Sequence, residues 1–402
     1  MSMKKIILIL SFLLISSGFA DVWKTENEWS SEYEQSYQNW IANDNFHRRI
    51  FSDPQSPYYG VPTDCADIIY AARIIFSYEN KLPFKVKNPV RKGLFSARYI
   101  SNSGNYFNSL KNEIDRVKAF ISKLAVHSGT TILAQNDTYP IAISEIRSGD
   151  IYVTKNNGIR HAYLIKKISN SGIFDLYYST VPRVVREIKF HRGVPLFSFS
   201  SSPWGFRRFK QPSEVNLDLN ELDSYSTEQY QLLKEVGEES ILNYISNRLR
   251  TEDESIEGRL DRVINNICRS IDDRIDAIKK AQVYVNSQIN NRCVNKSEYD
   301  NYSTPGLDKR IIKQIITLKN FYSKIKQVNY QLKIDSSKYN ALEDLLQGSE
   351  SNSLLCENQI APLSVQNFLY RYEQNQISSH PNDSLEARWG LDSNRTNCKK
   401  YY

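Results

Sequence analysis

Cys65 and His161 are the residues of this sequence whose types best suit nucleophilic chemistry. The chain has 402 residues and five cysteines, and four of the cysteines lie in its last third. In an oxidising compartment those four can form two disulfides, which leaves Cys65 as the unpaired thiol. A thiol attacks a carbonyl carbon as the thiolate, and an imidazole can take its proton and later pass it to the leaving group. We therefore expect Cys65 to be the nucleophile and His161 the general base, then the acid.

The segment around Cys65 has the pattern of a helix start. Thr63 or Asp64 can cap the first amide groups, and Pro83 ends the helix. Apolar residues recur at three- and four-residue spacing and form one face: Ile68, Ala72, Ile75 and Phe76. Free amides and the helix dipole favour negative charge at a helix N-terminus, so this position would favour the thiolate. A buried, inert cysteine is the alternative.

A second amphipathic helix is predicted at 108–125, and the sequence after it has the pattern of β-strands. Four strands are predicted: 151–153, 160–168, 173–180 and 184–190. The run Ser169-Asn170-Ser171-Gly172 is a strong turn signal between the second and third. The order is therefore a helix with Cys65, a further helix, and an antiparallel meander whose second strand carries His161.

Three short motifs follow one another in an order that is typical of one enzyme family. They are Asp64-Cys65, Gly149-Asp150-Ile151 and His161-Ala162-Tyr163-Leu164-Ile165. Residues 58–182 resemble the NlpC-type cell-wall peptidases of the papain-like superfamily. In that family an Asp-Cys pair opens a helix, a Gly-Asp turn starts the next strand, and a His starts the strand after it. Ala66-Asp67 replaces the family's usual Ser-Gly, and an insertion around 85–140 is required, which indicates a distant branch.

The resemblance implies a papain-like fold and a hydrolase that cuts an amide bond in cell-wall stem peptides. It also implies that a Tyr just before the nucleophile lines the substrate site. Tyr59 is the candidate, with ordinary aromatic packing as the alternative, and Asp64 belongs to the same lining. The backbone amide of Cys65 would be one donor to the oxyanion.

The group that orients the imidazole can be sought by counting along the predicted hairpin. If Ile168 pairs with Ile173, His161 lies opposite Thr180. Asp175 would then lie about 16 Å away along the strand, at roughly 3.3 Å per residue. We therefore expect Thr180, Ser179 or a backbone carbonyl to orient the ring.

Other kinds of catalytic centre find little support in the sequence. No Cys or His pair has the spacing of zinc ligands, so neither a metal nor another cofactor is expected. A Ser-based triad would need a Gly-x-Ser-x-Gly elbow, which the sequence lacks. The remaining histidines are expected to be surface or structural residues: His47, His127, His191 and His380.

The first twenty residues have the pattern of a cleavable signal peptide. Lys4 and Lys5 precede an apolar run at 6–15, and Gly18-Phe19-Ala20 fits the cleavage site. The run is shorter than the ~20 residues that span a bilayer, which disfavours the alternative of an uncleaved anchor. We expect cleavage after Ala20, no later transmembrane segment, and a secreted or periplasmic location.

The mature chain is expected to be an α+β protein with two domains. A papain-like, hydrolase-like domain would cover 21–215, and a helical domain would cover 216–402 after a polar linker at 211–225. Apolar residues at three- and four-residue spacing predict two of its helices, one with Leu260, Ile264, Ile267, Ile271, Ile275 and Ile278 and one with Ile311, Ile315, Leu318, Phe321 and Tyr322. The cysteines of the second domain are Cys268, Cys293, Cys356 and Cys398. Three pairings are open, and Cys268–Cys293 with Cys356–Cys398 is favoured because neighbours in sequence need the least chain folding.

The charge of +7 becomes +5 when Lys4 and Lys5 are removed. Basic residues cluster at Arg183, Arg186, Lys189 and Arg192 and at Arg207, Arg208 and Lys210. Such clusters suit contact with an anionic envelope polymer such as peptidoglycan, but an ordinary solvated face is favoured. No nucleic-acid motif is present.

The sequence thus favours an exported thiol hydrolase that acts on an amide bond. Two alternatives stay open. The same fold could transfer acyl groups, as transglutaminase-like enzymes and acyltransferases do. It could also be a catalytically inactive papain-like protein with a binding or structural role in the envelope, since Ser-Gly is missing after Cys65 and no clear acid accompanies His161.

Overall fold

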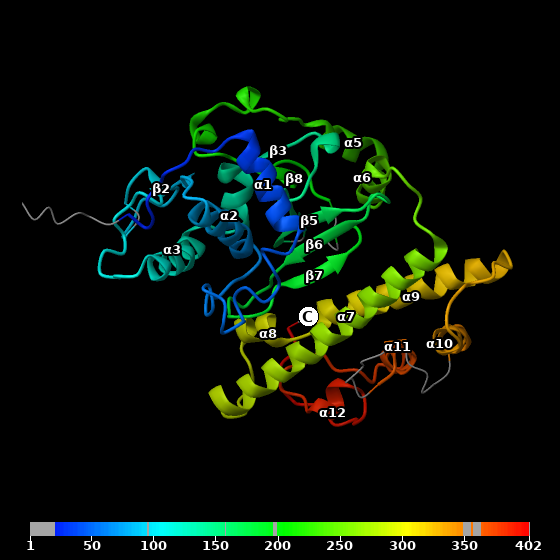
Figure 1. The fold of residues 1–402 in the computed structure, drawn as a ribbon. Coiled ribbons are helices and arrows are strands. Elements are labelled where there is room, and N and C mark those ends of the chain that lie inside the picture. The colour runs from blue at the N-terminus through cyan, green and yellow to red at the C-terminus, as the bar shows by residue number, and fades with distance from the viewer. Residues whose placement is uncertain are drawn as a thin grey trace, which may run out of the picture. The chain divides into compact units, whose positions relative to one another are not determined.

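A computed structural model describes residues 21–94, 96–156, 158–195, 199–348, 355–356 and 363–401, and it shows an α+β protein (Figure 1). The expected signal peptide lies outside the described residues. No helix in these ranges has both the length and the apolar composition needed to cross a membrane.

The chain forms two compact units, 1–164 with 183–188 and 199–231, and 165–182 with 189–198 and 232–402. The first contains helices α1 (Ser31–Ala42), α2 (Asp67–Glu79), α3 (Glu113–His127) and α4 (Thr130–Ile132), and strands β1 (Lys85–Lys87), β2 (Tyr99–Ser101), β3 (Thr138–Pro140), β4 (Ile151–Asn156) and β8 (Gly205–Phe209). Short helical turns accompany them: η1 (Leu133–Asp137), η2 (Ile143–Glu145), η3 (Glu214–Asn216) and η4 (Leu219–Glu221). Strand β5 (Ile159–Ile168) and helix α5 (Glu228–Val236) continue from the first unit into the second.

The second unit holds the rest of the strand region and the helical part of the chain. Its elements are β6 (Phe174–Tyr178), β7 (Lys189–Arg192), α6 (Ile241–Leu249), α7 (Ile256–Val283), η5 (Tyr284–Gln288), α8 (Lys296–Tyr302), α9 (Pro305–Gln327), α10 (Ser336–Gln347), α11 (Val365–Glu373) and α12 (Leu385–Arg388). The strand order of the main sheet is β3-β8-β4-β5-β6-β7, and the registers of its described pairs are antiparallel.

Helix α2 is the buried element next to Cys65. The four residues of the predicted apolar face are buried, but the buried surface is wider than predicted, because every residue from Asp67 to Ser77 is buried. Its Tyr70 ring packs edge-on against Phe209 of β8 at 5.7 Å between centroids. A helix buried on nearly all sides is held by packing, so its N-terminal end is a rigid platform.

The Gly-Asp turn before β4 has a structural purpose in this chain. Gly149 has φ +84°, and a Cβ added there would lie 2.7 Å from the Tyr37 ring, so only glycine fits without a shift. Asp150 is buried and accepts two hydrogen bonds from Arg208, from Nε and Nη2, both at 2.9 Å. The pair fixes the start of β4 to β8.

The expected solvated face at Arg207, Arg208 and Lys210 is wrong, because these side chains are buried. Strand β8 lies between β3 and β4, and all five of its residues are buried, so both of its faces are covered. Arg207 instead donates to the carbonyl oxygens of Thr138 and Pro203 at 2.7 and 2.6 Å. Burial lowers the pKa of Arg207 to about 10.

The strand predictions hold for most of the meander. Ser169 N donates to Ile173 O at 2.9 Å, so the hairpin turn is confirmed, but Ser169 rather than Ile168 is the residue that bonds to Ile173. The expected strand at 184–190 is wrong for its first five residues, since β7 begins at Lys189. Val184 forms a bridge with Thr63, and Ile188 N donates to Arg48 O at 2.7 Å. The backbone of these residues therefore pairs with segments outside the meander.

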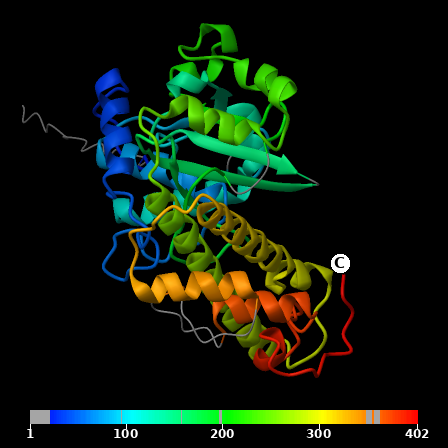
Figure 2. The ribbon, with the colours of Figure 1, turned by 90° about the vertical axis from the view of Figure 1, so that its right-hand side faces the viewer.

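The helical part of the second unit is built on α7 and α9, which run side by side (Figures 1 and 2). The predicted apolar stripes of both helices are buried and form one core with α10 and α11. Arg274 and Asp308 form an ion pair within it, with Arg274 Nε 2.6 Å from Asp308 Oδ1 and both side chains at most 1% exposed.

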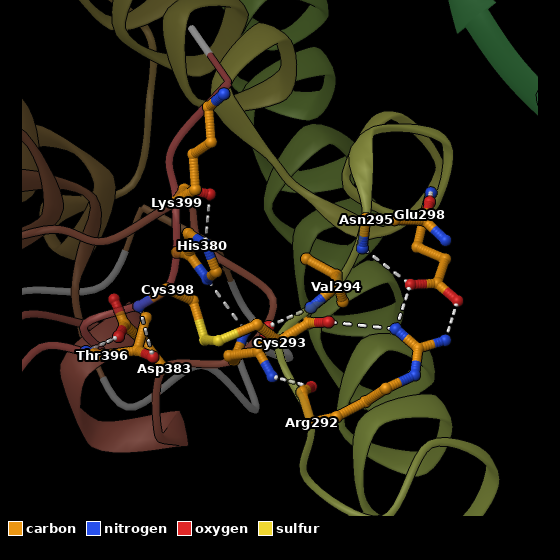
Figure 3. The surroundings of a disulfide bond; sticks show 11 residues. Arg292, Cys293, Val294, Asn295, Glu298, His380, Asp383, Thr396, Cys398 and Lys399 are labelled. Carbon is orange, nitrogen blue, oxygen red and sulfur yellow. Dashed lines mark hydrogen bonds and ion pairs between the residues drawn. A yellow bond between two sulfur atoms is a disulfide. The ribbon is translucent and has the colours of Figure 1, made fainter.

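The two disulfides join Cys268 to Cys356 and Cys293 to Cys398, so the favoured pairing of sequence neighbours is wrong. The reason is geometric: Cys268 lies within the long helix α7, which carries it away from Cys293. Figure 3 shows the second disulfide beside His380, whose Nε2 lies 3.2 Å from Lys399 O. The bonds interleave and tie the C-terminal segment to the helices, so both are cross-links between distant segments.

We expect peptide mapping without reduction to recover these two pairs and to leave Cys65 as the labelled thiol. Replacing either pair by serine should lower the free energy of unfolding by about 2–5 kcal/mol in denaturant titrations, because long loops are released. Cys65→Ser is the control and should change it much less. A recovered Cys268–Cys293 peptide would contradict the pairing.

Candidate functional site

Cys65 lies in the turn before α2, two residues ahead of the first helical residue, Asp67. The prediction that Thr63 or Asp64 caps this helix is wrong: Ala66 occupies the cap position and makes no side-chain cap bond. Thr63 is held in the bridge to Val184, which keeps the chain extended up to the turn. Cys65 is the free cysteine among the described residues, and its side chain is partly exposed.

The turn that carries Cys65 is held by a buried carboxylate. Asp67 Oδ2 accepts a hydrogen bond from the Asp64 amide at 2.8 Å. The same carboxylate receives Arg183 Nε at 2.6 Å and Nη2 at 3.1 Å, while the Asp67 side chain is fully buried. Arg183 Nη2 also donates to Ala125 O at the end of α3, at 2.6 Å. One guanidinium therefore joins the Cys65 turn to α3.

Thr130 is the direct partner of the thiol. Its Oγ1 lies 3.3 Å from Cys65 Sγ, and the Thr130 side chain is buried at the start of α4. Sequence reasoning missed this residue, because a threonine 65 positions away in a short irregular segment carries no periodic signal. In the sequence, Arg183 stands out only as a member of a basic cluster. The signal for its role was Asp67, since a carboxylate on a buried helix start needs a countercharge.

The surroundings of Cys65 disfavour the thiolate. Burial is the main cause that raises the pKa of Cys65 to about 11. The Thr130 hydrogen bond and the Ala66 backbone lower the pKa, whereas the negative charges of Asp64 and Asp67 raise it. The expected activation by the helix N-terminus is therefore outweighed, and at neutral pH Cys65 rests as the neutral thiol.

Asp67 itself is poised between two opposing effects. Burial and then the neighbouring Asp64 carboxylate raise the pKa of Asp67 to about 7, although Arg183 acts in the opposite direction. Two carboxylates share this one guanidinium, because Asp64 Oδ2 also lies 3.4 Å from Arg183 Nη2. The site thus carries more negative than positive charge close to the thiol.

His161 belongs to the same compact unit as Cys65. It is the third residue of β5, opposite Thr154 of β4, and its side chain is mostly buried. Its ring lies edge-on to Tyr163, with the centroids 4.6 Å apart. The strand position expected for this residue is confirmed, while its pairing with Cys65 stays a prediction.

The remaining predicted site residues are placed as follows. Tyr59 is 45% exposed and precedes the Cys65 turn, so it is free to contact a ligand. Ser179 and Thr180 follow β6 in the second unit, and their role as orienting groups stays a prediction. Asp175 is held by Arg192, whose Nε and Nη2 donate to it at 2.6 and 2.8 Å, which agrees with assigning it no part in orienting the imidazole.

Two histidines outside the proposed site are structural. His191 is buried in β7, and burial lowers its pKa to about 3. His380 is also buried and packs edge-on against Tyr299 at 5.1 Å. In the part of the chain that the structure describes, no group of three or more His, Cys, Asp or Glu side chains is placed to hold a metal ion.

No family model, no curated protein and no solved structure matches the chain.

The rate of Cys65 alkylation by iodoacetamide as a function of pH tests this electrostatic account. We expect a midpoint near 11, against about 8.5 for an unperturbed cysteine. Thr130→Val removes a stabilising hydrogen bond, so the pKa should rise and alkylation at pH 8 should slow several-fold, whereas the matched Thr130→Ser should keep the wild-type profile. Asp64→Asn removes a negative charge and should speed the reaction. A wild-type midpoint at or below 8.5 would contradict the account.

Proposed function

We propose that the chain is an exported thiol hydrolase that cleaves an amide bond, with Cys65 as nucleophile and His161 as general base. The observation that carries the proposal is the state of Cys65. Its thiol is unpaired and partly exposed, at the end of a buried helix and on a turn fixed by Asp67 and Arg183. The other four cysteines are paired in disulfides, which fits an oxidising compartment.

A base is required because the thiol rests protonated. With a pKa of about 11, only about one Cys65 in ten thousand is ionised at pH 7. In the proposed reaction, His161 takes the thiol proton as Sγ bonds to the carbonyl carbon. The tetrahedral intermediate collapses, the C–N bond breaks, and the imidazolium protonates the departing amine. Water, deprotonated by the imidazole, then attacks the thioester and releases the acid and the free thiol.

The substrate that we propose is a stem peptide of the cell wall. The support is the order of the Asp-Cys, Gly-Asp and His motifs, which resembles that of NlpC-type peptidases. The backbone amide of Cys65 would contribute to the oxyanion site. Exposed Tyr59 and partly exposed Asp64 would contact the peptide.

One observation favours a second candidate, an inactive relative of such enzymes with a binding role. Burial and two carboxylates disfavour the nucleophilic form of Cys65, the reverse of what an activated cysteine needs. The hydrolysis assay separates the two candidates, because a slow thiol is expected in both. An inactive protein would give no product.

Hydrolysis is tested by incubating the full mature chain with purified peptidoglycan and identifying new amino and carboxyl termini by mass spectrometry. Cys65→Ala should abolish the products, and His161→Ala should slow their release about 10²–10⁴-fold, since proton transfer is lost. His127→Gln is the matched control in the same unit and should be as active as the wild type. Thermal unfolding checks that each variant folds.

An added amine acceptor, such as glycine amide, distinguishes acyl transfer from hydrolysis. A hydrolase yields the free acid even at a high acceptor concentration, whereas a transferase yields the new amide. If the wild type and Cys65→Ala release equal amounts of product, Cys65 is not the nucleophile.

A further inference from the structure

The second unit contains a cavity of about 430 Å³ that the proposed hydrolase chemistry does not use. Its wall is formed by the turn between β5 and β6, by Arg192 at the end of β7, and by the beginning of α7. A second hollow shares Lys167, Ser169, Ser171 and Glu254 with it and extends it towards 252–255. The volume lies within the range of small-molecule sites, which is about 300–1,000 Å³.

The walls of this cavity are held together by hydrogen bonds within the unit. The amides of Thr251 and Glu252 donate to Asn170 O at 2.7 and 3.0 Å. Ser246 Oγ donates to Gly172 O at 2.6 Å, and a Cβ added to Gly172 would lie 1.9 Å from Ser246 O. Asn266 Nδ2 donates to Arg192 O at 2.6 Å. The cavity is therefore preformed.

The chemistry of the wall is polar. Among the described lining residues, Ile173 is the only one with an apolar side chain. Serine hydroxyls, an asparagine amide and carboxylates supply both donors and acceptors, as a ligand with several hydroxyl groups requires. An apolar ligand would leave these groups unpaired, which costs binding free energy.

The wall also carries an excess of positive charge, with four cationic side chains against three carboxylates. Arg192 and Arg262 each use Nε and Nη2 to bind a carboxylate, of Asp175 and Glu254, at 2.6–2.8 Å. Their Nη1 groups make no hydrogen bond to described residues, and Lys167 makes no ion pair with them. Lys167, Arg192 and Arg262 therefore line the cavity with donor groups that no described residue uses.

Two further observations agree with a positive potential here. Arg269 stacks over the Phe190 ring at 4.6 Å, so its charge stays beside the cavity wall. Burial chiefly, and then the charges of Arg310, Arg262 and Arg269, lower the pKa of the neighbouring His191 to about 3.

We propose that this cavity binds an anionic saccharide, a sugar unit that carries one carboxylate or phosphate group. The anionic group would contact Lys167 and the Nη1 groups of Arg192 and Arg262. Hydroxyl groups of the sugar would bind the serines, Asn265 and the carboxylate of Asp261. The cavity is thus a second site, for glycan recognition, and it does not depend on whether Cys65 is catalytic.

The test is isothermal titration of the full mature chain with glucuronate, glucose 6-phosphate, glucose and inorganic phosphate. We expect at least one sugar anion to bind about tenfold or more tightly than glucose and than phosphate alone. Tighter binding of glucuronate identifies the carboxylate as the recognised group, and tighter binding of glucose 6-phosphate identifies the phosphate. No detectable binding of either sugar anion, or equal binding of glucose, overturns the proposal. If inorganic phosphate binds as tightly as glucose 6-phosphate, and glucuronate binds no more tightly than glucose, the site does not recognise a sugar.

Two surface variants make the test specific to the cavity. Lys167→Gln removes an exposed ammonium without an ion pair, and Asn265→Asp adds a negative charge at constant size. Each should reduce binding of the sugar anion to the level of glucose while thermal unfolding stays unchanged. Lys313→Gln, at an exposed position of α9, is the matched control and should bind like the wild type. If Lys167→Gln and Asn265→Asp both bind like the wild type, the cavity is not the site.

Discussion

The ion pair between the buried carboxylate of Asp67 and the partly exposed guanidinium of Arg183 is the interaction on which the candidate site depends. Arg183 lies 116 positions from Asp67, and its guanidinium also binds the end of α3. Removing Arg183 would leave the fully buried Asp67 carboxylate without its countercharge, which is destabilising. This pair and the buried helix α2 therefore fix the turn that carries Cys65.

The same pair explains why the site does not resemble an activated cysteine at rest. The carboxylates that anchor the turn also repel a thiolate, and burial adds to the effect. Thr130 offsets only part of it with its hydrogen bond. Anchoring and activation thus oppose each other, so any reaction at Cys65 depends on a base that accepts the proton during the attack. The neutral resting thiol would also resist oxidation, since the thiolate is the reactive form.

The second unit is stabilised in a different way, by an apolar core with cross-links between distant segments. The α7 and α9 stripes bury most of their aliphatic side chains, and the Cys268–Cys356 disulfide lies in this core. The Cys293–Cys398 disulfide ties the C-terminal segment to the stretch between η5 and α8. The polar cavity lies at the start of α7, where the β5–β6 turn is fixed by backbone hydrogen bonds. A rigid helical scaffold with a preformed polar cavity suits recognition of a ligand, whereas the first unit holds the group suited to chemistry.

What the sequence alone determined is what local patterns encode: the buried face of α2, the β5 strand with His161, the turn at 169–172 and the stripes of α7 and α9. Periodicity reveals these features because each depends on residues a few positions apart. The tertiary structure alone decided that Thr130 contacts the thiol, that Arg183 neutralises Asp67, that Arg207 and Arg208 are buried, and which cysteines pair. These outcomes depend on where distant segments meet, and burial then changes the charge state of each group, as the pKa of Cys65 shows.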